Sequence, residues 1–455
     1  MSASSPAELT SLLHDPGTYV SGVPYAELAR LRQEHGIAFV EEPELPGWPA
    51  GPGYWLVLRH GDIRSVLGDP GTFSSAVGGT QIRDPATEED LHYVRQMMLN
   101  MDPPEHSRLR RLLAQSFTPR AVRTLEHQIR AHCTAIVDRM LAGPAEVDFA
   151  KEVSADLPLL ALADILGVPS EDRWLMFDWA NRVIGWQDPD YAVSAAFDHG
   201  QGSAMAREAL KHRPVPDADG RMPDPRSKEG MGDLYAYAHL LGEEKRRSPG
   251  GDVMSILMSA VDDGPEEGGP RRVSIEEFEN LFWLFAVAGN ETLRNGIPGG
   301  MVGLLENPGA QEALRTDPGR IPAAVEEMLR WWTPVMTFRR TATRDVEVAG
   351  TRVRAGDKVV VSFAGGNRDE TVYADPDTFD IDRFAVTGLD RPRAHLAFGH
   401  GPHFCLGAHL ARVQMATLFD EVLTRTTWIE PAGEAAYLRS NFQRGVKSLP
   451  VRWSA

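Results

Sequence analysis

The sequence predicts a mainly α-helical protein that carries small β-sheets. Apolar residues recur at helical spacing in several long stretches, above all in the stretch that begins after Ser274 and continues to Glu306. Short runs rich in β-branched and aromatic residues lie towards both ends of the chain, separated by turn-forming glycine and proline. We therefore expect helices to form the scaffold and strands to form small accessory sheets.

The composition is that of an ordinary soluble protein. Of 455 residues, 42% are hydrophobic and 24% are charged, and the net charge of −17 argues against general nucleic-acid binding. The two cysteines, Cys133 and Cys405, do not suggest a disulfide framework. The N-terminus has no signal-peptide pattern, and no apolar run reaches about 18 residues. We therefore expect a cytoplasmic protein without a membrane partner.

The N-terminal part of the chain combines a helix with strands. A helix is expected around Ala26 to Glu34, and strands are expected at Ile37 to Val40 and at Tyr54 to Leu58. Residues 76–93 show no clear period, which predicts a mobile surface loop. Prolines then end one segment, and a basic helix begins near His106.

The middle of the chain alternates helical and polar stretches. Residues 121–186 have the spacing of scaffold helices. Between about residues 192 and 230 the composition shifts to Gly, Pro, Asp, Lys and Arg, which predicts a long polar loop, either a lid or a disordered segment. Helical spacing returns from Asp233 to Arg247. A capping box at Ser274 to Glu277 then opens the most apolar helix, which Pro298 is expected to bend.

The C-terminal third predicts an ion pair, strands and a final hairpin. Glu327 and Arg330 are three residues apart on one helical face, which by itself predicts a weak surface pair. Strands with two turns are expected between Phe338 and Phe363, and the hairpin is expected between Leu438 and Val451.

Cys405 lies at the end of a glycine-rich loop, directly before a helical run. Unpaired N–H groups at a helix N-terminus favour a thiolate, which serves as a nucleophile or as a soft metal ligand. From these residues alone, three interpretations are open: a buried structural thiol, a zinc site with the nearby histidines, and a haem whose iron binds the thiolate. Zinc is disfavoured because no spaced pair of ligands accompanies Cys405.

The pattern Phe398-x-x-Gly401-x-x-x-Cys405-x-Gly407 resembles the haem-binding loop of the cytochrome P-450 monooxygenases. Further matches follow the order of that family, namely Asp102-Pro103-Pro104-x-His106, Ala288-Gly289-x-Glu291-Thr292 and Glu327-x-x-Arg330. The resemblance spans about residues 20–453. It implies a single cytochrome P-450 domain over residues 1–455, with the haem between the long central helix and the helix that follows Cys405.

The resemblance also implies the roles of individual residues. Cys405 would be the axial ligand of haem b, and Glu291 and Thr292 would support proton delivery and oxygen activation. Further haem contacts would come from His106, Arg110, Ala288, Gly289, Arg340, Phe398, Gly399, His403 and Gly407. The Glu327–Arg330 pair would be buried and would brace the haem loop. From the residues alone, Thr292 could instead bond to its own helix, and Glu291 could form a surface pair.

The function that the resemblance implies is hydroxylation or epoxidation of a hydrophobic small molecule with O2. Electrons would come from a separate ferredoxin and ferredoxin reductase that use NAD(P)H, because no span remains for a fused reductase. Arg108, Arg111 and Arg412 are candidates for a basic patch that binds an acidic ferredoxin. We expect a monomer.

The substrate is predicted less closely than the chemistry. Apolar candidates for its pocket are Phe285, Ala288, Val335, Met336 and Phe442. Residues 181–190 and 338–343 resemble family members that act on terpenoids, sterols or branched lipids; a polyketide, macrolide or aromatic natural product is the alternative. Two functions of another class stay open, a peroxide-driven peroxygenase and a haem-binding sensor.

Overall fold

The computed structural model describes residues 12–45, 49–85, 87–184, 188, 202–218, 222–225, 227–261, 273–386 and 393–455. The chain divides into two compact units. Unit 1 comprises Met1–Asp84, Val122–Leu157 and Thr292–Ala455, and unit 2 comprises Pro85–Ala121 and Pro158–Glu291. The single domain over residues 1–455 stays a prediction.

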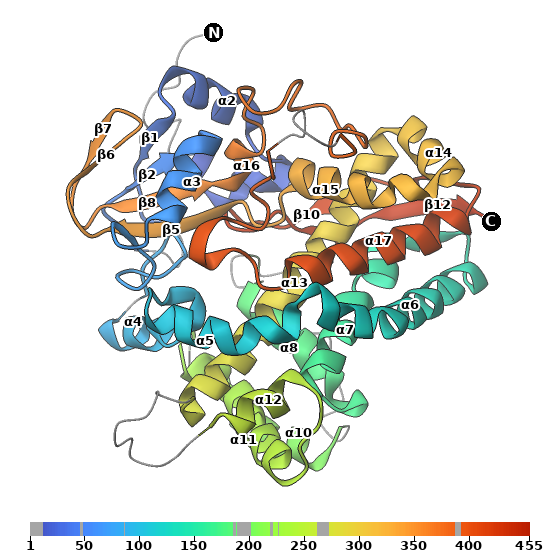
Figure 1. Ribbon diagram of the computed structural model, residues 1–455, viewed down its shortest axis with the longest axis horizontal. Helices are drawn as coiled ribbons and strands as arrows, with labels where there is room; N and C mark the ends of the chain where they lie inside the picture. Colours follow the sequence, from blue (N-terminus) through green and yellow to red (C-terminus); the bar gives the residue numbers. More distant parts are fainter. Residues whose placement is uncertain are drawn as a thin grey trace. The chain divides into compact units, whose positions relative to one another are not determined.

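A five-stranded sheet organises the N-terminal part of unit 1 (Figure 1). The order of its strands is β1 (Ile37–Val40), β2 (Tyr54–Val57), β8 (Lys358–Ser362), β5 (Thr337–Ala342) and β3 (Phe73–Ser74). Strands β2 and β8 run parallel, and the other neighbours are antiparallel. The inner strands carry buried valines such as Val57, Val359 and Val361, so the sheet forms a core together with α3 (His60–Gly68) and α16 (Phe363–Gly366). The strands predicted near residues 37 and 54 are confirmed.

Among the described residues of unit 1, three smaller sheets contain the other strands. They pair β4 (Glu146–Asp148) and β9 (Trp428–Pro431) with β12 (Pro450–Ser454), β10 (Ala436–Tyr437) with β11 (Val446–Ser448), and β6 (Val346–Val348) with β7 (Thr351–Val353). A C-terminal hairpin is present as β10–β11, but its first strand lies at Ala436–Tyr437, before the predicted start at Leu438; only the second strand falls where it was predicted.

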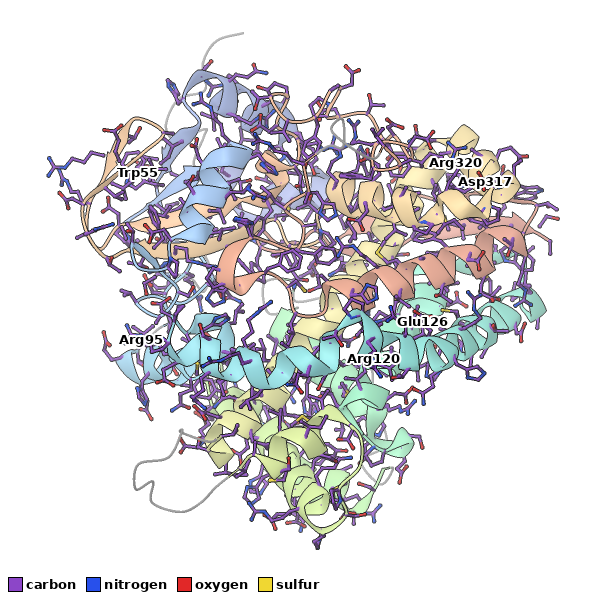
Figure 2. The ribbon with its side chains drawn as sticks, viewed as in Figure 1. Trp55, Arg95, Arg120, Glu126, Asp317 and Arg320 are labelled. Carbon is purple, nitrogen blue, oxygen red and sulfur yellow. The ribbon has the colours of Figure 1, made fainter. Side chains whose placement is uncertain are left out.

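Besides α3, α16 and the second part of α13 (Ile275–Glu306), unit 1 contains further helices. They are η1 (Pro16–Ser21), α2 (Tyr25–Glu34), most of α6 (Pro119–Ala142), η4 (Phe149–Ser154), α14 (Pro308–Thr316), η9 (Pro318–Arg320), α15 (Ile321–Trp332), η11 (Gly401–His403) and α17 (Ala408–Thr424). Helix α17 packs against α14 and α15 (Figure 1). Asp317 and Arg320, labelled in Figure 2, fix the turn before α15, because Asp317 accepts a hydrogen bond from the Gly319 amide at 3.1 Å and Arg320 pairs with Asp382.

Within its described residues, unit 2 consists of helices. They are α4 (Glu88–Arg95), η2 (Met98–Asn100), α5 (Glu105–Ala114), η3 (Gln115–Phe117), most of α7 (Asp156–Leu166), η5 (Ser170–Asp172), α8 (Arg173–Ile184), α10 (Ala204–Ala209), η7 (Leu210–His212), η8 (Glu229–Met231), α11 (Gly232–Arg247), α12 (Val253–Ser259) and the first part of α13 (Ile275–Glu306). The predicted capping box is confirmed, since the Ser274 amide donates to the Glu277 carboxylate at 3.0 Å and the Glu277 amide donates to the Ser274 hydroxyl at 3.1 Å. Helix α13 has 32 residues and includes Pro298.

The segment predicted as a mobile surface loop at residues 76–93 is anchored instead. Ile82 is only 6% exposed, and its carbonyl accepts a hydrogen bond from the Lys358 ammonium at 3.1 Å. The Arg339 amide donates to the Thr80 carbonyl at 2.8 Å. Helix α4 occupies the end of the segment. The prediction was wrong because the partners that hold these carbonyls come from distant strands.

The long polar loop predicted at about residues 192–230 is partly helical, with α10, η7 and η8 among its described residues. Ser203 caps α10, and its own amide donates to the buried Asp172 carboxylate at 2.7 Å. Arg213 pairs with the buried Asp178 at 2.7 Å. The polar composition therefore reflects caps and ion pairs. Residues 189–201, 219–221 and 226 lie outside the described residues, and the lid stays a prediction.

Candidate functional site

Cys405 lies on a closed loop between η11 and α17. Its backbone N–H donates to the Phe398 carbonyl at 2.9 Å, and this hydrogen bond closes the segment from Phe398 to Cys405, which includes η11. The Cys405 side chain is exposed. Cys133 is fully buried, and burial raises the pKa of its thiol to about 12. Of the two thiols, only that of Cys405 is accessible to a ligand.

Glycines shape this loop in different ways. Gly399 and Gly401 both have φ of +70°, a conformation that favours glycine. A Cβ atom at Gly401 would also lie 2.3 Å from the Leu67 carbonyl oxygen, so no side chain fits there. A Cβ atom at Gly407 would meet no described atom within 4 Å. The loop is therefore tightly packed at Gly401 and borders open space at Gly407.

Glu326 connects α15 to both sides of the loop. It accepts a hydrogen bond from Arg412 Nη2 at 2.8 Å and lies 3.3 Å from His395 Nε2. The Arg412 guanidinium also lies 4.5 Å from the centre of the Phe398 ring. Burial acts to raise the pKa of Glu326, but Arg412 and His395 outweigh it and lower the pKa to about 2. Sequence reasoning missed Glu326, although it directly precedes the Glu-x-x-Arg pattern.

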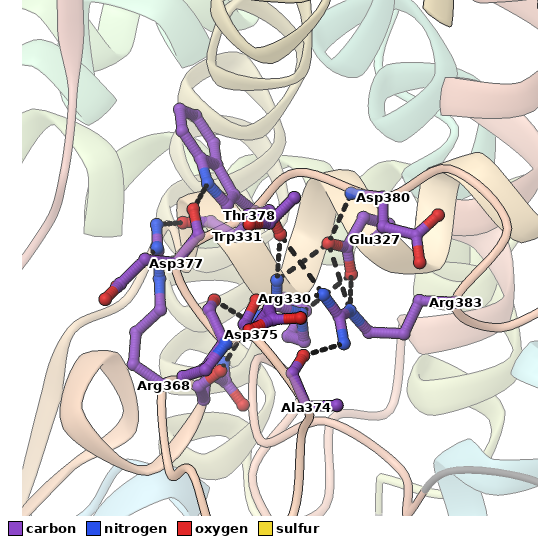
Figure 3. Close-up of polar contacts among 12 residues, drawn as sticks. Glu327, Arg330, Trp331, Arg368, Ala374, Asp375, Asp377, Thr378, Asp380 and Arg383 are labelled. Atoms are coloured by element: carbon purple, nitrogen blue, oxygen red, sulfur yellow. Dashed lines mark hydrogen bonds and ion pairs between the residues drawn. The ribbon is translucent and has the colours of Figure 1, made fainter.

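Glu327 and Arg330 form the centre of a buried network (Figure 3). Both side chains are 0% exposed, and Arg330 Nη2 lies 2.7 Å from Glu327 Oε1. Arg330 Nη1 donates to the carbonyls of Asn367 and Pro376. The Asn367 side chain in turn accepts from the Leu396 amide at 2.6 Å, where the cysteine loop begins. The surface pair expected from spacing alone is wrong, and the buried pair implied by the resemblance is confirmed.

Unit 1 also contains other residues predicted to contact haem. Arg340 lies in β5, is 2% exposed and donates from Nη1 to the Arg339 carbonyl at 2.8 Å. His403 Nε2 lies 3.3 Å from the Ser75 hydroxyl, and Phe398 is 9% exposed. Unit 1 thus contains Arg340, Phe398, Gly399, His403, Cys405 and Gly407.

Unit 2 contains the predicted haem contacts on α5, His106 and Arg110, and those on α13, Ala288 and Gly289. His106 is 1% exposed and Arg110 is partly buried, one turn further along α5. Ala288 and Gly289 are exposed, although the residues before and after them on α13 are mostly buried. A Cβ atom at Gly289 would lie 3.1 Å from Leu162, so glycine is needed there for packing as well.

Glu291 is fully buried, so the surface ion pair that its position allowed is wrong. It is the last residue of unit 2 on α13, and the partly buried Thr292 is the first residue of unit 1 on the same helix. The two predicted catalytic residues are therefore neighbours on one continuous helix.

The predicted substrate-pocket residues lie in two apolar clusters. In unit 1, the Met336 amide donates to the Phe442 carbonyl at 2.9 Å, and the Phe442 ring stacks on Phe338 with 5.8 Å between centres. Val335 forms a β-bridge with Gln443. In unit 2, the Phe285 ring stacks on Phe117 at 5.6 Å.

The basic patch predicted from Arg108, Arg111 and Arg412 is largely neutralised. Arg412 pairs with Glu326, and Arg108 pairs with both Glu277 and Glu105. Arg111 is exposed. These carboxylates were not predicted, because two of the three lie far along the chain from the arginines that they pair with.

Known proteins match this chain over nearly its whole length. A family model described as Cytochrome P450 matches residues 320–446. A steroid C26-monooxygenase of Mycolicibacterium smegmatis is 34% identical over 95% of this chain and 91% of its own. A methyl-branched lipid omega-hydroxylase of Mycobacterium bovis is 36% identical over 94% and 90%. The crystal structure of CYP108D1 from Novosphingobium aromaticivorans, 29% identical, matches with a TM-score of 0.81 over 99% of both chains.

None of the helices described here has the length and apolar character required to cross a membrane. The residues around Cys405 fit a haem, because the Cys405 side chain is exposed and the nearby Gly407 borders open space. Members of the matched family hold haem through a cysteine thiolate and use it with O2 to oxidise hydrophobic small molecules. With more than 30% identity over almost all of its residues, this chain belongs to the cytochrome P450 family and is a haem-thiolate monooxygenase.

Proposed function

We propose that Cys405 is the axial ligand of haem b and that the enzyme hydroxylates a steroid or a methyl-branched lipid. The observation that carries the assignment of Cys405 is its accessible thiol on a loop held by Glu326 and by the Arg330 network. When bound, the haem supplies the activation of O2. The protein supplies the thiolate, the surrounding apolar groups and the protons.

The haem propionates would be bound by His106 and Arg110 of unit 2 and by Arg340 and His403 of unit 1. A guanidinium presents parallel N–H groups that match a carboxylate, and protonated imidazole adds a further charged donor. The structure places each of these residues on a regular element or directly at its end, which supports a fixed orientation.

Glu291 and Thr292 would manage protons during the reaction. Glu291 is buried in an apolar helix, where a carboxyl group is kept away from bulk water. We assign it the role of passing protons inward, and we assign Thr292 the role of a hydrogen-bonding partner for O2. This assignment predicts that Thr292→Ala continues to consume O2 and NAD(P)H while it loses product. A haem-binding sensor would show no such uncoupling.

The substrate class is supported by the two curated relatives and by the apolar side chains near Val335 and Phe285. The relatives are named for oxidation of a steroid and of a methyl-branched lipid. Both kinds of molecule are largely apolar, so burial of their surface would supply most of the binding free energy.

Electrons would come from a separate ferredoxin and its NAD(P)H-dependent reductase. Because Arg108 and Arg412 are already paired with carboxylates, Arg111 is left as the accessible cation of the predicted docking patch. With only Arg111 accessible in this patch, the rate at which ferredoxin reduces the enzyme should depend weakly on ionic strength. A steep dependence would mean that other cations bind the ferredoxin.

The ligand assignment is tested by the ferrous carbonyl spectrum of the haem-loaded protein. Wild type should show the band typical of a thiolate ligand, and Cys405→Ser should lose it. Cys133→Ser is the matched control and should retain it. A histidine-type band in wild type, or loss of the thiolate band in Cys133→Ser alone, contradicts the assignment.

The substrate class is tested by shifts of the Soret band on titration with a steroid, a methyl-branched fatty acid and a macrolide. We expect the first two to shift the band and the macrolide to have no effect. Product formation should require ferredoxin, its reductase and NAD(P)H. Equal turnover with hydrogen peroxide alone would indicate a peroxygenase instead.

A further inference from the structure

A cavity of about 180 Å³ lies within unit 1, between η1, the segment that follows α15 and the β10–β11 hairpin. Its wall includes apolar side chains, among them Met336 and Leu438, and polar ones, among them Gln443 and Arg444. Arg444 is the guanidinium on this wall and is partly buried, and its surroundings differ from those of the buried Arg32, Arg330 and Arg368 of the same unit.

The Arg444 side chain is held in place by aromatic rings and by carbonyl groups. Its guanidinium lies 3.7 Å from the centre of the Trp332 ring. Nη1 donates to the Tyr25 hydroxyl at 3.0 Å and to the carbonyls of Trp331 and Trp332 at 3.2 Å. One edge of the guanidinium is therefore fixed by hydrogen bonds, and the group also lies against an aromatic ring.

The other edge of the Arg444 guanidinium is open. Within the described part of the chain, Nε and Nη2 have no hydrogen-bond partner, and both remain accessible because the group lines the cavity. Nε and Nη2 are the pair of nitrogens that can bind the two oxygens of one carboxylate.

The charge of Arg444 also has no acidic partner nearby. Among the described residues, no carboxylate oxygen lies within 4.0 Å of it, and Glu306 acts only at longer range. Other buried arginines of unit 1 do have such partners. Arg32, Arg330 and Arg368 pair with Glu370, Glu327 and Asp377 at 2.6, 2.7 and 2.9 Å.

A cation removed from water without a counter-charge is unfavourable. Burial indeed lowers the pKa of Arg444, and the neighbouring Arg368 lowers it further. Aromatic rings and carbonyls offset only part of this cost. A ligand with a negative charge and a planar pair of oxygens would remove the remainder.

We propose that this cavity binds a small carboxylate, whose oxygens accept hydrogen bonds from Nε and Nη2 of Arg444 and whose short apolar chain lies against Met336 and Leu438. Among the residues that line the cavity, Arg444 is the one cation, which favours a monocarboxylate over a phosphate, because a phosphate carries more charge. Because Met336 is also a candidate for the substrate pocket, a bound carboxylate would alter substrate affinity, a consequence that rests on the proposed function.

The proposal is tested with hexanoate, using the thermal unfolding midpoint and isothermal titration of the haem-loaded enzyme. Hexan-1-ol has the same chain without the charge and is the matched ligand control. Hexanoate should raise the unfolding midpoint of wild type, and hexan-1-ol should not. Equal effects of the two ligands would mean hydrophobic binding alone and would overturn the proposal.

Variants of Arg444 separate its charge from its geometry. Arg444→Gln should weaken hexanoate binding by about tenfold or more, since it removes charged hydrogen bonds. Arg444→Lys keeps the charge but loses the two-point contact, and should bind with intermediate affinity. Arg439→Gln is the control, because the Arg439 side chain is 40% exposed and its Nη2 lies 3.6 Å from Asp15 Oδ1. An equal loss in Arg439→Gln would indicate general attraction to surface cations and would contradict the assignment.

Gln443→Glu tests the same site without altering Arg444. The Gln443 side chain accepts a hydrogen bond from Asn295 Nδ2 at 3.1 Å, which a carboxylate of the same shape can also accept. The variant adds a fixed negative charge to the cavity wall, so it should lose the response to hexanoate even if Arg444→Gln does not fold. Full retention of hexanoate binding in this variant would rule out the site. Since neither readout depends on substrate oxidation, failure here leaves the proposed monooxygenase function untouched.

Discussion

Two arginines of unit 1, Arg330 and Arg444, both donate to backbone carbonyls, but among the described residues only Arg330 also has an acidic partner. Arg330 donates to the backbone carbonyls of Asn367 and Pro376, and Arg444 donates to those of Trp331 and Trp332 at the end of α15. Arg330 is 0% exposed and has Glu327 as a counter-charge, and its guanidinium is hydrogen-bonded on both sides (Figure 3). Arg444 is bonded on one edge only and lines a cavity. The first arginine has a purely structural environment, whereas the second leaves two donors for a ligand.

The largest loss of stability is expected when Arg330 loses the negative charge of Glu327. Glu327→Gln keeps the shape of the side chain but leaves Arg330 buried without its partner. It should lower the free energy of unfolding by about 3–5 kcal/mol, measured by denaturant titration. Asp382→Asn, which breaks the exposed Arg320–Asp382 pair, is the control and should cost less than about 1 kcal/mol. Equal losses of stability in both variants would show that the buried Glu327–Arg330 pair contributes no more than an exposed one.

An intermediate loss of stability is expected at Glu326. It pairs with Arg412 and His395, but its side chain is 23% exposed. Its folded pKa of about 2 lies below the ordinary value of 4.5, so its stabilising contribution is full above pH 4.5 and is lost as the pH falls from 4.5 towards 2. Glu326→Gln should therefore cost about 1–3 kcal/mol at neutral pH. The difference between wild type and variant should shrink over that acid range. A difference that is independent of pH would show that Arg412 and His395 do not stabilise the carboxylate.

The smallest effect on stability is expected at Arg444. Arg444→Gln removes hydrogen bonds but also removes a partly buried charge that has no acidic partner among the described residues, so the two changes oppose each other. The free energy of unfolding without ligand should change by about 1 kcal/mol or less. Denaturant titration of Arg444→Gln and Glu327→Gln under the same conditions checks that Arg444→Gln has the smaller effect on the free energy of unfolding. A loss as large as that of Glu327→Gln would place Arg444 among the structural arginines.

Elements with local signals were predictable from the sequence. The capping box at Ser274 to Glu277 and the strands near residues 37 and 54 depend on neighbouring residues and were confirmed. Elements fixed by distant partners were not. The segment around Ile82 looked irregular because Arg339 and Lys358, which hold it, lie on strands far along the chain.

In the candidate site, too, local patterns were predictable and contacts between distant residues were not. The loop motif around Cys405 and the Glu-x-x-Arg pattern were visible as residue spacing. The bridge from Glu326 to His395 and Arg412 was not, because three residues on three segments meet only in the folded chain. For the same reason, the arginines chosen for a docking patch gave no sign that two of them are neutralised.

The pairing of β2 with β8 has a consequence for the synthesis of this protein. Tyr54 pairs with Lys358 and Val57 pairs with Val361, so the inner part of the main sheet joins residues made early with residues made late. While the ribosome translates the intervening segment, the backbone donors and acceptors on that side of β2 have no strand to bind. A nascent chain in this state exposes an edge prone to aggregation. Productive folding of the N-terminal region therefore waits for the C-terminal third, and chaperones that shield extended strands should raise the yield.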